Sequence, residues 1–504
     1  MKRWACLLAL SLAVPGWGQE KDKGKKDKPA EKPAPVSVDD LLRQAEAKAA
    51  AGDKDGAAEA LRKAGELPGA TGEPGLRLGR LLEGQGEPDS AIDAYQAAAE
   101  KLTGAAKGEA LGRMAVLQDM RGMPEAAATA QAAGTADPEG AWPAIALAHL
   151  RAREGKGDEA LTLAQKAAAS GGAAASVALG HAQEARGDVA AAEAAYRVAL
   201  ADEQQKVAAS VGLARVLRKT GRAAEAEPLL KAALESAPGA VDAYKESARV
   251  KVALNRAAEA MGDAATAAAL AEGDIDAQRL VQEVTVAKAL GYLATNQADL
   301  AIQDLSQLRD ANPTLAAARV GLARALVARR QIEPALAELQ KAAELEPALA
   351  EAHYHLGTVQ HIHKRDATAA VPAFEKAVAA APGNLDYRTA LGAALVDAKQ
   401  YDRAVSELGK VTASPGYARA DAWLQLGAAH LAAKRYKDSI AALDKAVAVA
   451  PSSAQAEAYL AWAYFGLKDS KNFTLHGSKA RTLGHKEPTL LGYLVRVEGG
   501  EAIK

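Results

Sequence analysis

The sequence has 504 residues, of which 49% are hydrophobic, 25% are charged and only 4% are aromatic. Basic and acidic residues number 62 and 63, which gives a net charge of −1, so no charge excess indicates nucleic-acid binding. The low aromatic content disfavours a large core around a buried cofactor. Alanine supplies much of the apolar content and favours closely packed helices. A chain of this length forms either several globular domains or one long array of repeated units.

Residues 1–18 have the pattern of a secretory signal peptide. Lys2 and Arg3 are followed by an apolar run over residues 5–14, and Gly18 supplies a small residue before a cleavage site at Gln19. The apolar run is well short of the ~20 residues that span a bilayer. We therefore predict cleavage between residues 18 and 19 and a location in the periplasm or outside the cell. No later segment is apolar enough to predict a transmembrane helix.

Residues 19–37 are rich in lysine, proline and alanine and predict a disordered linker. This segment is either a solvated spacer or a weak adhesive for anionic lipid or peptidoglycan, and its interspersed acidic residues favour the spacer. The only cysteine of the chain, Cys6, lies near the start of the apolar run and not after it, so we do not expect lipid attachment. Once the leader is removed, no disulfide bond or cysteine metal site is expected.

A pattern of small and apolar residues recurs about every 34 residues after residue 38. Its clearest copy covers residues 420–453, where two successive segments each have one apolar helical face. Gly427 and Ala446 are small enough for the two helices to pack closely as an antiparallel hairpin, and Pro451 ends the second helix. Equivalent Leu–Gly or Leu–Ala pairs occur at residues 78–79, 179–180, 213–214, 322–323, 356–357 and 391–392.

This pattern resembles the tetratricopeptide repeat, a helical hairpin with small residues at fixed positions and a closing proline. The resemblance covers roughly residues 38–487. It implies an all-α, right-handed superhelical solenoid of about 12–13 hairpins that binds protein or peptide partners in its concave groove. Pro488 begins a further helix that we expect to cap the last hairpin.

The repeat units divide into two groups. Units begin near residues 38, 72, 107, 141, 173, 207 and 241, and then near 282, 316, 350, 385, 420 and 454. The spacing slips by about seven residues between the two groups. We therefore predict an N-terminal array over 38–274, a C-terminal array over 275–487, and a capping helix and tail over 488–504. The sequence leaves open whether residues 272–281 form a hinge or a packed irregular turn.

The sequence lacks the motifs typical of enzymes. It has no His-Glu-x-x-His, no Gly-x-Ser-x-Gly and no phosphate-binding loop. No segment outside the repeats is long enough for a catalytic domain. We therefore predict that the chain is not an enzyme and binds no cofactor.

The candidate binding residues occupy one position of the repeat. The resemblance implies that the residue after the small Gly or Ala of each first helix faces the groove, and here these residues are Arg80, His149, His181, Arg215, Arg249 and Arg324. Further groove candidates are Arg153, Arg218, Lys219, Lys245 and Trp462. Arginine suits carboxylates of a bound chain. Alternatively, these arginines pair with neighbours such as Glu83 and Glu184 and form a solvated polar face.

A histidine cluster spans residues 353–363, with members at His353, His355, His361 and His363. Two imidazoles on a helix share a metal ion when they are three or four residues apart, and these spacings differ. We therefore predict no metal site, although a metal-responsive role remains an alternative.

Taken together, the sequence predicts an exported scaffold that binds envelope proteins or their peptide segments. The family resemblance implies assembly of a pilus, a secretion system or a surface-motility machine as the setting. The alternative is a binder of an anionic envelope polymer, whose affinity would fall steeply with salt.

Overall fold

The computed structural model describes residues 36–169 and 172–503. The predicted signal peptide and nearly all of the predicted linker lie outside these residues. The described residues form 27 α-helices and one short π-helix, and contain no β-strand. Among them, no helix combines the length and the hydropathy needed to cross a membrane.

The helices form thirteen antiparallel hairpins followed by a single helix. The first helices of the hairpins are α1 (Val38–Ala50), α3 (Glu73–Gln85), α5 (Gly104–Met120), α7 (Ala141–Arg153), α9 (Ala173–Arg186), α11 (Lys206–Lys219), α13 (Val241–Ala253), α15 (Ile275–Ala294), α17 (Ala316–Ala328), α19 (Ala350–Thr358), α21 (Leu385–Asp397), α23 (Ala420–Ala432) and α25 (Ala454–Gly466). The second helices are α2 (Lys54–Glu66), α4 (Pro88–Lys101), α6 (Ala126–Ala136), α8 (Gly157–Ala168), α10 (Val189–Ala199), α12 (Ala223–Ser236), α14 (Ala257–Leu270), α16 (Ala298–Ala311), α18 (Ile332–Leu345), α20 (Ala367–Ala380), α22 (Tyr401–Thr412), α24 (Tyr436–Val449) and α26 (Ser470–Thr482). The single helix is α27 (Pro488–Glu498).

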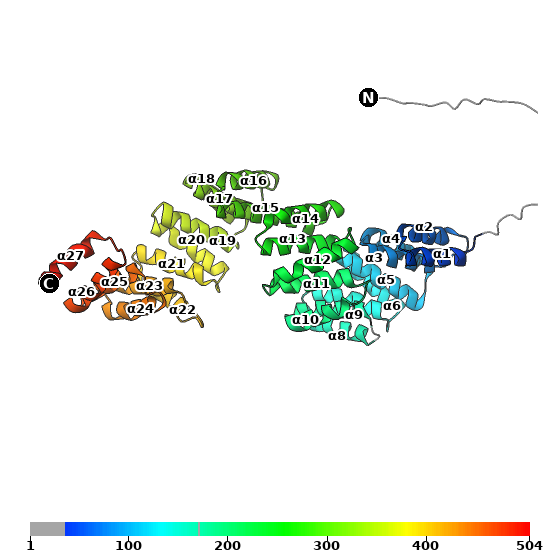
Figure 1. Cartoon of the computed structure of the whole chain (residues 1–504), viewed down its shortest axis with the longest axis horizontal. Helices are drawn as coiled ribbons and strands as arrows, with labels where there is room; N and C mark the ends of the chain where they lie inside the picture. Colours follow the sequence, from blue (N-terminus) through cyan, green and yellow to red (C-terminus); the bar gives the residue numbers. More distant parts are fainter. Residues whose placement is uncertain (1–35, 170–171, 504) are drawn as a thin grey trace, which may run out of the picture.

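The hairpins stack in sequence order into an elongated molecule. In Figure 1 the blue-to-green hairpins are gathered in one lobe, and the yellow-to-red hairpins extend away from it. Each hairpin packs on the next one, and most first helices also contact the first helix that follows. The all-α solenoid and its number of hairpins are thus confirmed, while the right-handed superhelix stays a prediction.

The two helices of a hairpin touch where the first one carries a small residue. A Cβ atom on Gly427 would lie 2.4 Å from Cγ of Leu443, so only glycine permits this contact. The buried hydroxyl of Ser439 donates a hydrogen bond of 2.8 Å to the carbonyl oxygen of Gly427, which satisfies both groups. Gly180 approaches Tyr196 equally closely. The predicted close contact at these glycines is therefore confirmed.

The slip in repeat spacing is an extension of α15. This helix begins at Ile275, about two turns before the expected start, and the side chain of Asp274 caps it by accepting hydrogen bonds from two backbone amides. The added turns are packed, since Ala277 and Leu280 are fully buried. Lys245 on α13 contacts the Asp274 carboxylate at 3.3 Å. The irregular segment is thus a packed joint between neighbouring hairpins.

The sequence also predicts an extra residue at 363–366, in the turn of the hairpin that begins at Ala350, whereas the structure accommodates it within a helix. A π-helix over Val359–His363 continues α19, and the wider π turn accommodates one more residue than an α turn. The α20 helix then starts at Ala367, capped by Asp366.

The turn between the two helices of a hairpin contains a residue with positive φ. In the first six hairpins this residue is glycine, as at Gly155 with φ of 74°. In the last seven it is Asn255, Asn296, Arg330, Arg365, Lys399, Lys434 or Lys468. The turn after α23 has the hydrogen bond from the Arg435 amide to the His430 carbonyl oxygen, 2.8 Å, that is typical of a left-handed helix ending.

We predict that Gly427→Leu destabilises the α23–α24 hairpin by ~1–3 kcal/mol or more, because the added side chain overpacks the contact with Leu443. Since the α23–α24 hairpin packs only on the hairpins next to it, the loss should be local. Hydrogen exchange measures this directly. We expect faster exchange in α21–α26 and unchanged exchange in the N-terminal lobe. Faster exchange along the whole chain would contradict a local effect.

The turns provide a matched pair of substitutions that should change hairpin stability in opposite directions. A left-handed conformation costs a non-glycine residue ~1–2 kcal/mol, while glycine makes the unfolded chain more favourable by ~0.4–1 kcal/mol. Lys434→Gly should therefore stabilise its hairpin by up to ~1 kcal/mol, and Gly155→Ala should destabilise its own by a similar amount. No other atom lies within 4 Å of a Cβ at Gly155, so backbone strain alone is tested. Local stability is measured by hydrogen exchange, and a change in the same direction in both variants would refute this reasoning.

Candidate binding groove

The first helices of successive hairpins surround a cavity of about 580 Å³ in the N-terminal lobe. Its lining comes from α5, α7, α9, α11, α13 and the start of α15, together with the turn between α3 and α4. We call this cavity the groove. It is lined by the first helices, which the resemblance predicted to face the ligand.

The floor of the groove is apolar. Ile145, Val177 and Val211 each come from a different first helix and occupy the same place in their repeats. All three are buried, and the small residues Ala174 and Ala208 lie beside them in the lining. The floor can therefore receive apolar side chains of a ligand.

The structure brings together most of the predicted site residues, but not all. Those that line the groove are His149, His181, Arg215, Arg249, Arg153, Lys219 and Lys245. Those outside its lining are Arg80, Arg218, Arg324 and Trp462. Arg80 lines a separate hollow beside α1.

The arginines of the predicted column pair with carboxylates on an adjacent first helix. Arg215 on α11 lies 3.3 Å from Glu184 on α9, and Arg249 on α13 lies 3.1 Å from Asp276 on α15. Arg80 on α3 binds Glu109 on α5 through two hydrogen bonds of 2.9 and 2.6 Å. In the unliganded chain, these arginines are therefore held in place by the acidic neighbours that the alternative reading proposed.

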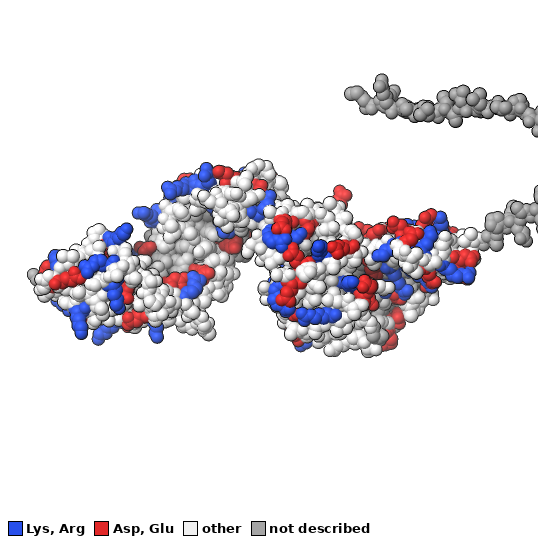
Figure 2. All heavy atoms as spheres, viewed as in Figure 1, with Lys and Arg blue, Asp and Glu red and all other residues white. Residues whose placement is uncertain are grey.

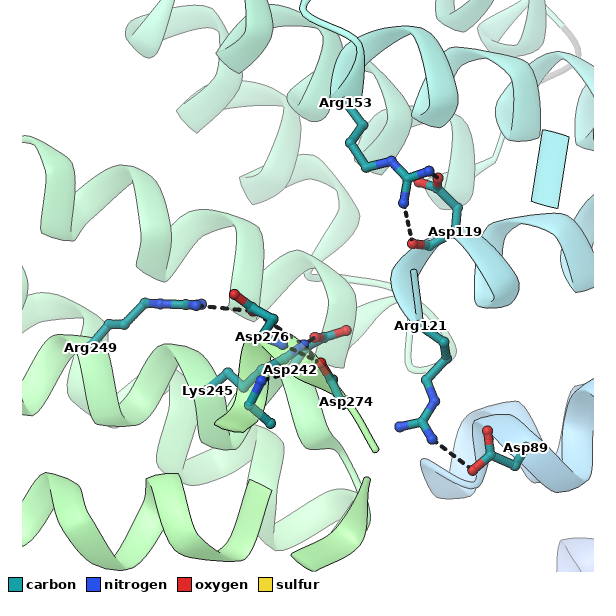
Figure 3. Close-up of polar contacts among 10 residues, drawn as sticks. Asp89, Asp119, Arg121, Arg153, Asp242, Lys245, Arg249, Asp274 and Asp276 are labelled. Atoms are coloured by element: carbon teal, nitrogen blue, oxygen red, sulfur yellow. Dashed lines mark hydrogen bonds and ion pairs between the residues drawn. The ribbon is translucent and has the colours of Figure 1, made fainter. Parts of the chain in front are cut away.

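The secondary candidates are paired as well. The closest N–O distances in these pairs are 2.8 Å for Arg153 and Asp119, 3.2 Å for Lys219 and Glu184, 2.6 Å for Arg218 and Glu246, and 2.9 Å for Lys245 and Asp242. Figure 3 shows two groups of such contacts. Lys245 and Arg249 meet three aspartates in one group, while Arg153 and Arg121 bind Asp119 and Asp89 in the other. Lys245 is almost fully enclosed by its partners, with 7% of its side chain exposed.

Glu184 has three side-chain partners in the groove. It binds Arg215 and Lys219 and also accepts a hydrogen bond of 2.7 Å from the hydroxyl of Tyr196. Burial, together with the nearby Glu184 carboxylate, raises the pKa of Tyr196, so the tyrosine stays a hydrogen-bond donor. An equivalent set of Glu83, Tyr95 and Arg113 lies three hairpins nearer the N-terminus.

His149, which is buried, and His181, which is half-buried, form a close pair in the groove wall. Their Nδ1 atoms are 3.2 Å apart and their rings meet edge to face at 4.5 Å. Burial, reinforced by Arg215, lowers the pKa of His149 to about 4. Burial and the neighbouring His149 lower the pKa of His181 well below its usual value. Both rings are thus neutral at pH 7, so the expected basic ridge has its positive charges at the arginines and lysines alone.

Two predicted residues lie in the C-terminal half. Arg324 lies close enough to His355 to contribute, after burial, to lowering the pKa of that histidine to about 4. Trp462 donates a hydrogen bond of 3.3 Å to Glu487 and packs edge to face on Phe465 and Tyr493. Trp462 therefore belongs to the contact between α25 and the capping helix α27.

The histidine cluster is divided among separate partners. His353 is buried and hydrogen bonds to the carbonyl oxygen of Pro347 at 2.9 Å. His361 binds Asp397 at 2.8 Å, whereas His363 is exposed. Within the described residues, no three histidine, cysteine, aspartate or glutamate side chains converge as a metal site would require.

The aspartates of the groove were missing from the sequence prediction. It named Glu83 and Glu184 as possible partners of the arginines, but Asp119, Asp242, Asp274 and Asp276 also line the groove. Arg113 was also missed: it is buried, binds Glu83 and stacks 3.8 Å above the ring of Trp142. A search for alternating charges on successive first helices would have found the acidic residues.

The sequence matches family models over much of its C-terminal two thirds. A tetratricopeptide-repeat model matches residues 211–277, 320–384 and 389–454, and a second tetratricopeptide-repeat model matches residues 361–416. A search of curated proteins found no match.

Several solved structures are similar to this chain. The Cut9–Hcn1 complex structure has a chain with 15% identity, covering 91% of this chain and 96% of its own length, with a TM-score of 0.37. MamA from Desulfovibrio magneticus RS-1 has 26% identity, coverages of 34% and 97%, and a TM-score of 0.32. PilW, a type IV pilus biogenesis factor, has 15% identity, coverages of 42% and 98%, and a TM-score of 0.38. The matches to the family models, between residues 211 and 454, show that the chain carries tetratricopeptide repeats.

Proposed function

We propose that the chain is an exported scaffold that holds a partner protein by a peptide segment in the groove. The observation that carries this proposal is the composition of the groove, in which an apolar floor runs across three helices between walls of paired charges. Peptide-binding sites combine apolar contact for affinity with polar groups for orientation in this way. The family models support the choice of a protein partner.

The ion pairs define how a partner would be oriented. Arg215 shares Glu184 with Lys219, and Arg249 shares Asp276 with Lys245. A ligand carboxylate can therefore bind Arg215 or Arg249 in place of the protein carboxylate. Glu184 and Asp276 then remain paired with Lys219 and Lys245. The guanidinium groups are already positioned, which lowers the entropy lost on binding.

The cellular setting is part of the proposal. The signal-peptide pattern of residues 1–18 supports export to the periplasm or beyond, and the family resemblance supports assembly of a pilus, a secretion system or a surface-motility machine. On the face drawn in Figure 2, basic and acidic side chains are interspersed over the N-terminal lobe and over the hairpins that extend from it. That mixture favours a protein partner over an anionic polymer or nucleic acid.

Site-specific photo-crosslinking tests where the partner binds. A benzophenone side chain at Ala208 in the groove should capture a specific protein in cells that produce the chain. The matched control carries the same group at Val198, on the outer helix α10, whose side chain is 66% exposed. Capture of the same protein from both positions, or from Val198 alone, would contradict binding in the groove.

Arg215→Ala combined with Arg249→Ala should weaken binding of the captured partner at least tenfold, because one charged hydrogen bond contributes ~1.5–3 kcal/mol and ~1.4 kcal/mol is one decade. Folding should change little, since Glu184 and Asp276 keep Lys219 and Lys245 as partners. Isothermal titration measures the affinity.

Arg222→Ala is the control for this double substitution. Arg222 pairs with Glu193 and Glu225 on the second helices α10 and α12 and should leave affinity unchanged. Normal binding by the double variant, together with loss of binding on substitution of Trp462, would assign the binding surface to the C-terminal half instead.

A further inference from the structure

Two turns that are far apart in the sequence touch each other in the N-terminal lobe. A Cβ atom on Gly239, in the loop before α13, would lie 2.7 Å from the carbonyl oxygen of Gly86, in the turn after α3. A Cβ atom on Gly86 would in turn lie 3.0 Å from the amide nitrogen of Ala240. Backbone therefore meets backbone here, and Ala237 and Ala240 are buried beside the contact. We call this contact the clasp.

The clasp closes one turn of the array around the groove. The lining of the groove includes Glu83 and Gly86 from the second hairpin as well as Asp274 and Asp276 from the start of the eighth. On the same side, Glu203 and Gln204 in the loop before α11 share a hollow with residues of α1 and α3. Figure 1 shows the blue-to-green hairpins gathered in this lobe. The seventh hairpin thus comes back into contact with the second, and the first helices between them surround the groove.

We propose that the groove is a closed channel that admits only an unfolded polypeptide segment, which enters from one end. The inference rests on the proposed function and specifies its partner. A folded domain would need the clasp to open before it reached Val177 or Val211 on the floor. An extended segment fits, since it presents its side chains to the apolar floor and its charges to the paired walls. The partner site is accordingly a flexible tail or linker of the bound protein.

Thiol labelling measures this restriction without any partner. The protein is the full chain with Cys6→Ser, carrying a single cysteine by Ala208→Cys in the groove or by Ala393→Cys on α21. Both alanines are half-buried on first helices. The probes are N-ethylmaleimide, a maleimide on the end of an unfolded Gly/Ser/Pro peptide, and a maleimide linked closely to folded ubiquitin.

The expected result is selective exclusion of the folded probe. Relative to N-ethylmaleimide, ubiquitin-maleimide should label Ala208→Cys at least about tenfold more slowly than Ala393→Cys, because labelling must wait for transient opening of the clasp. The unfolded probe should label both sites at similar relative rates. If the rate of ubiquitin-maleimide labelling, divided by the rate of N-ethylmaleimide labelling, is the same at both cysteines, the proposal is overturned.

The chain contains a matched pair of glycines for opening the clasp. Ala-Pro-Gly occurs at 237–239 and again at 381–383, and a Cβ on Gly383 has no atom within 4 Å. Gly239→Glu should push the clasp apart and restore labelling of Ala208→Cys by ubiquitin-maleimide, whereas Gly383→Glu should have no effect. Failure of Gly239→Glu to speed this labelling, in a variant whose circular dichroism is unchanged, would overturn the closed channel. Such a failure leaves partner capture at Ala208 as a separate result, so the two proposals fail independently.

Discussion

The structure depends on a steric constraint that recurs in several hairpins, where a glycine of the first helix admits a large side chain of the second. At Gly180 the large side chain is Tyr196. Because this contact fixes how the two helices cross, successive hairpins stack with equivalent positions aligned. The aligned row of Ile145, Val177 and Val211 in the groove is a direct result. Core packing and the geometry of the binding surface therefore have the same cause.

The ion pairs along the groove have a different role from the apolar core. Partly exposed pairs such as Arg249 and Asp276 contribute only ~0–1 kcal/mol each, so they do not account for the stability of the array. They connect neighbouring first helices, and they hold each guanidinium group in a defined place. The enclosed Lys245 goes further, because it joins α13 to the capping residue of α15, Asp274, where the repeat spacing changes. Charge here maintains alignment where the steric pattern is interrupted.

The sequence was informative where a feature depends on one hairpin alone. The recurring small and apolar residues predicted about 12–13 units, and the break in their spacing located the irregular start of α15. The site was harder to predict, because its properties arise between hairpins. The neutral state of His149 and His181 results from burial against each other across α7 and α9. The contact of Gly86 with Gly239 results from small rotations that accumulate over five hairpins, and no local pattern encodes that sum.

The clasp also changes how the chain is expected to unfold. An open repeat array has contacts only between neighbours, so it melts gradually from its ends. A link between Gly86 and Gly239 makes every hairpin from α3 to α13 necessary for the same contact. Loss of any one of them removes that contact for all, which joins these hairpins into a single cooperative unit. The hairpins from α17 onward keep the gradual melting of an open array. We therefore expect the N-terminal lobe to unfold in one cooperative step and the C-terminal hairpins to unfold one after another.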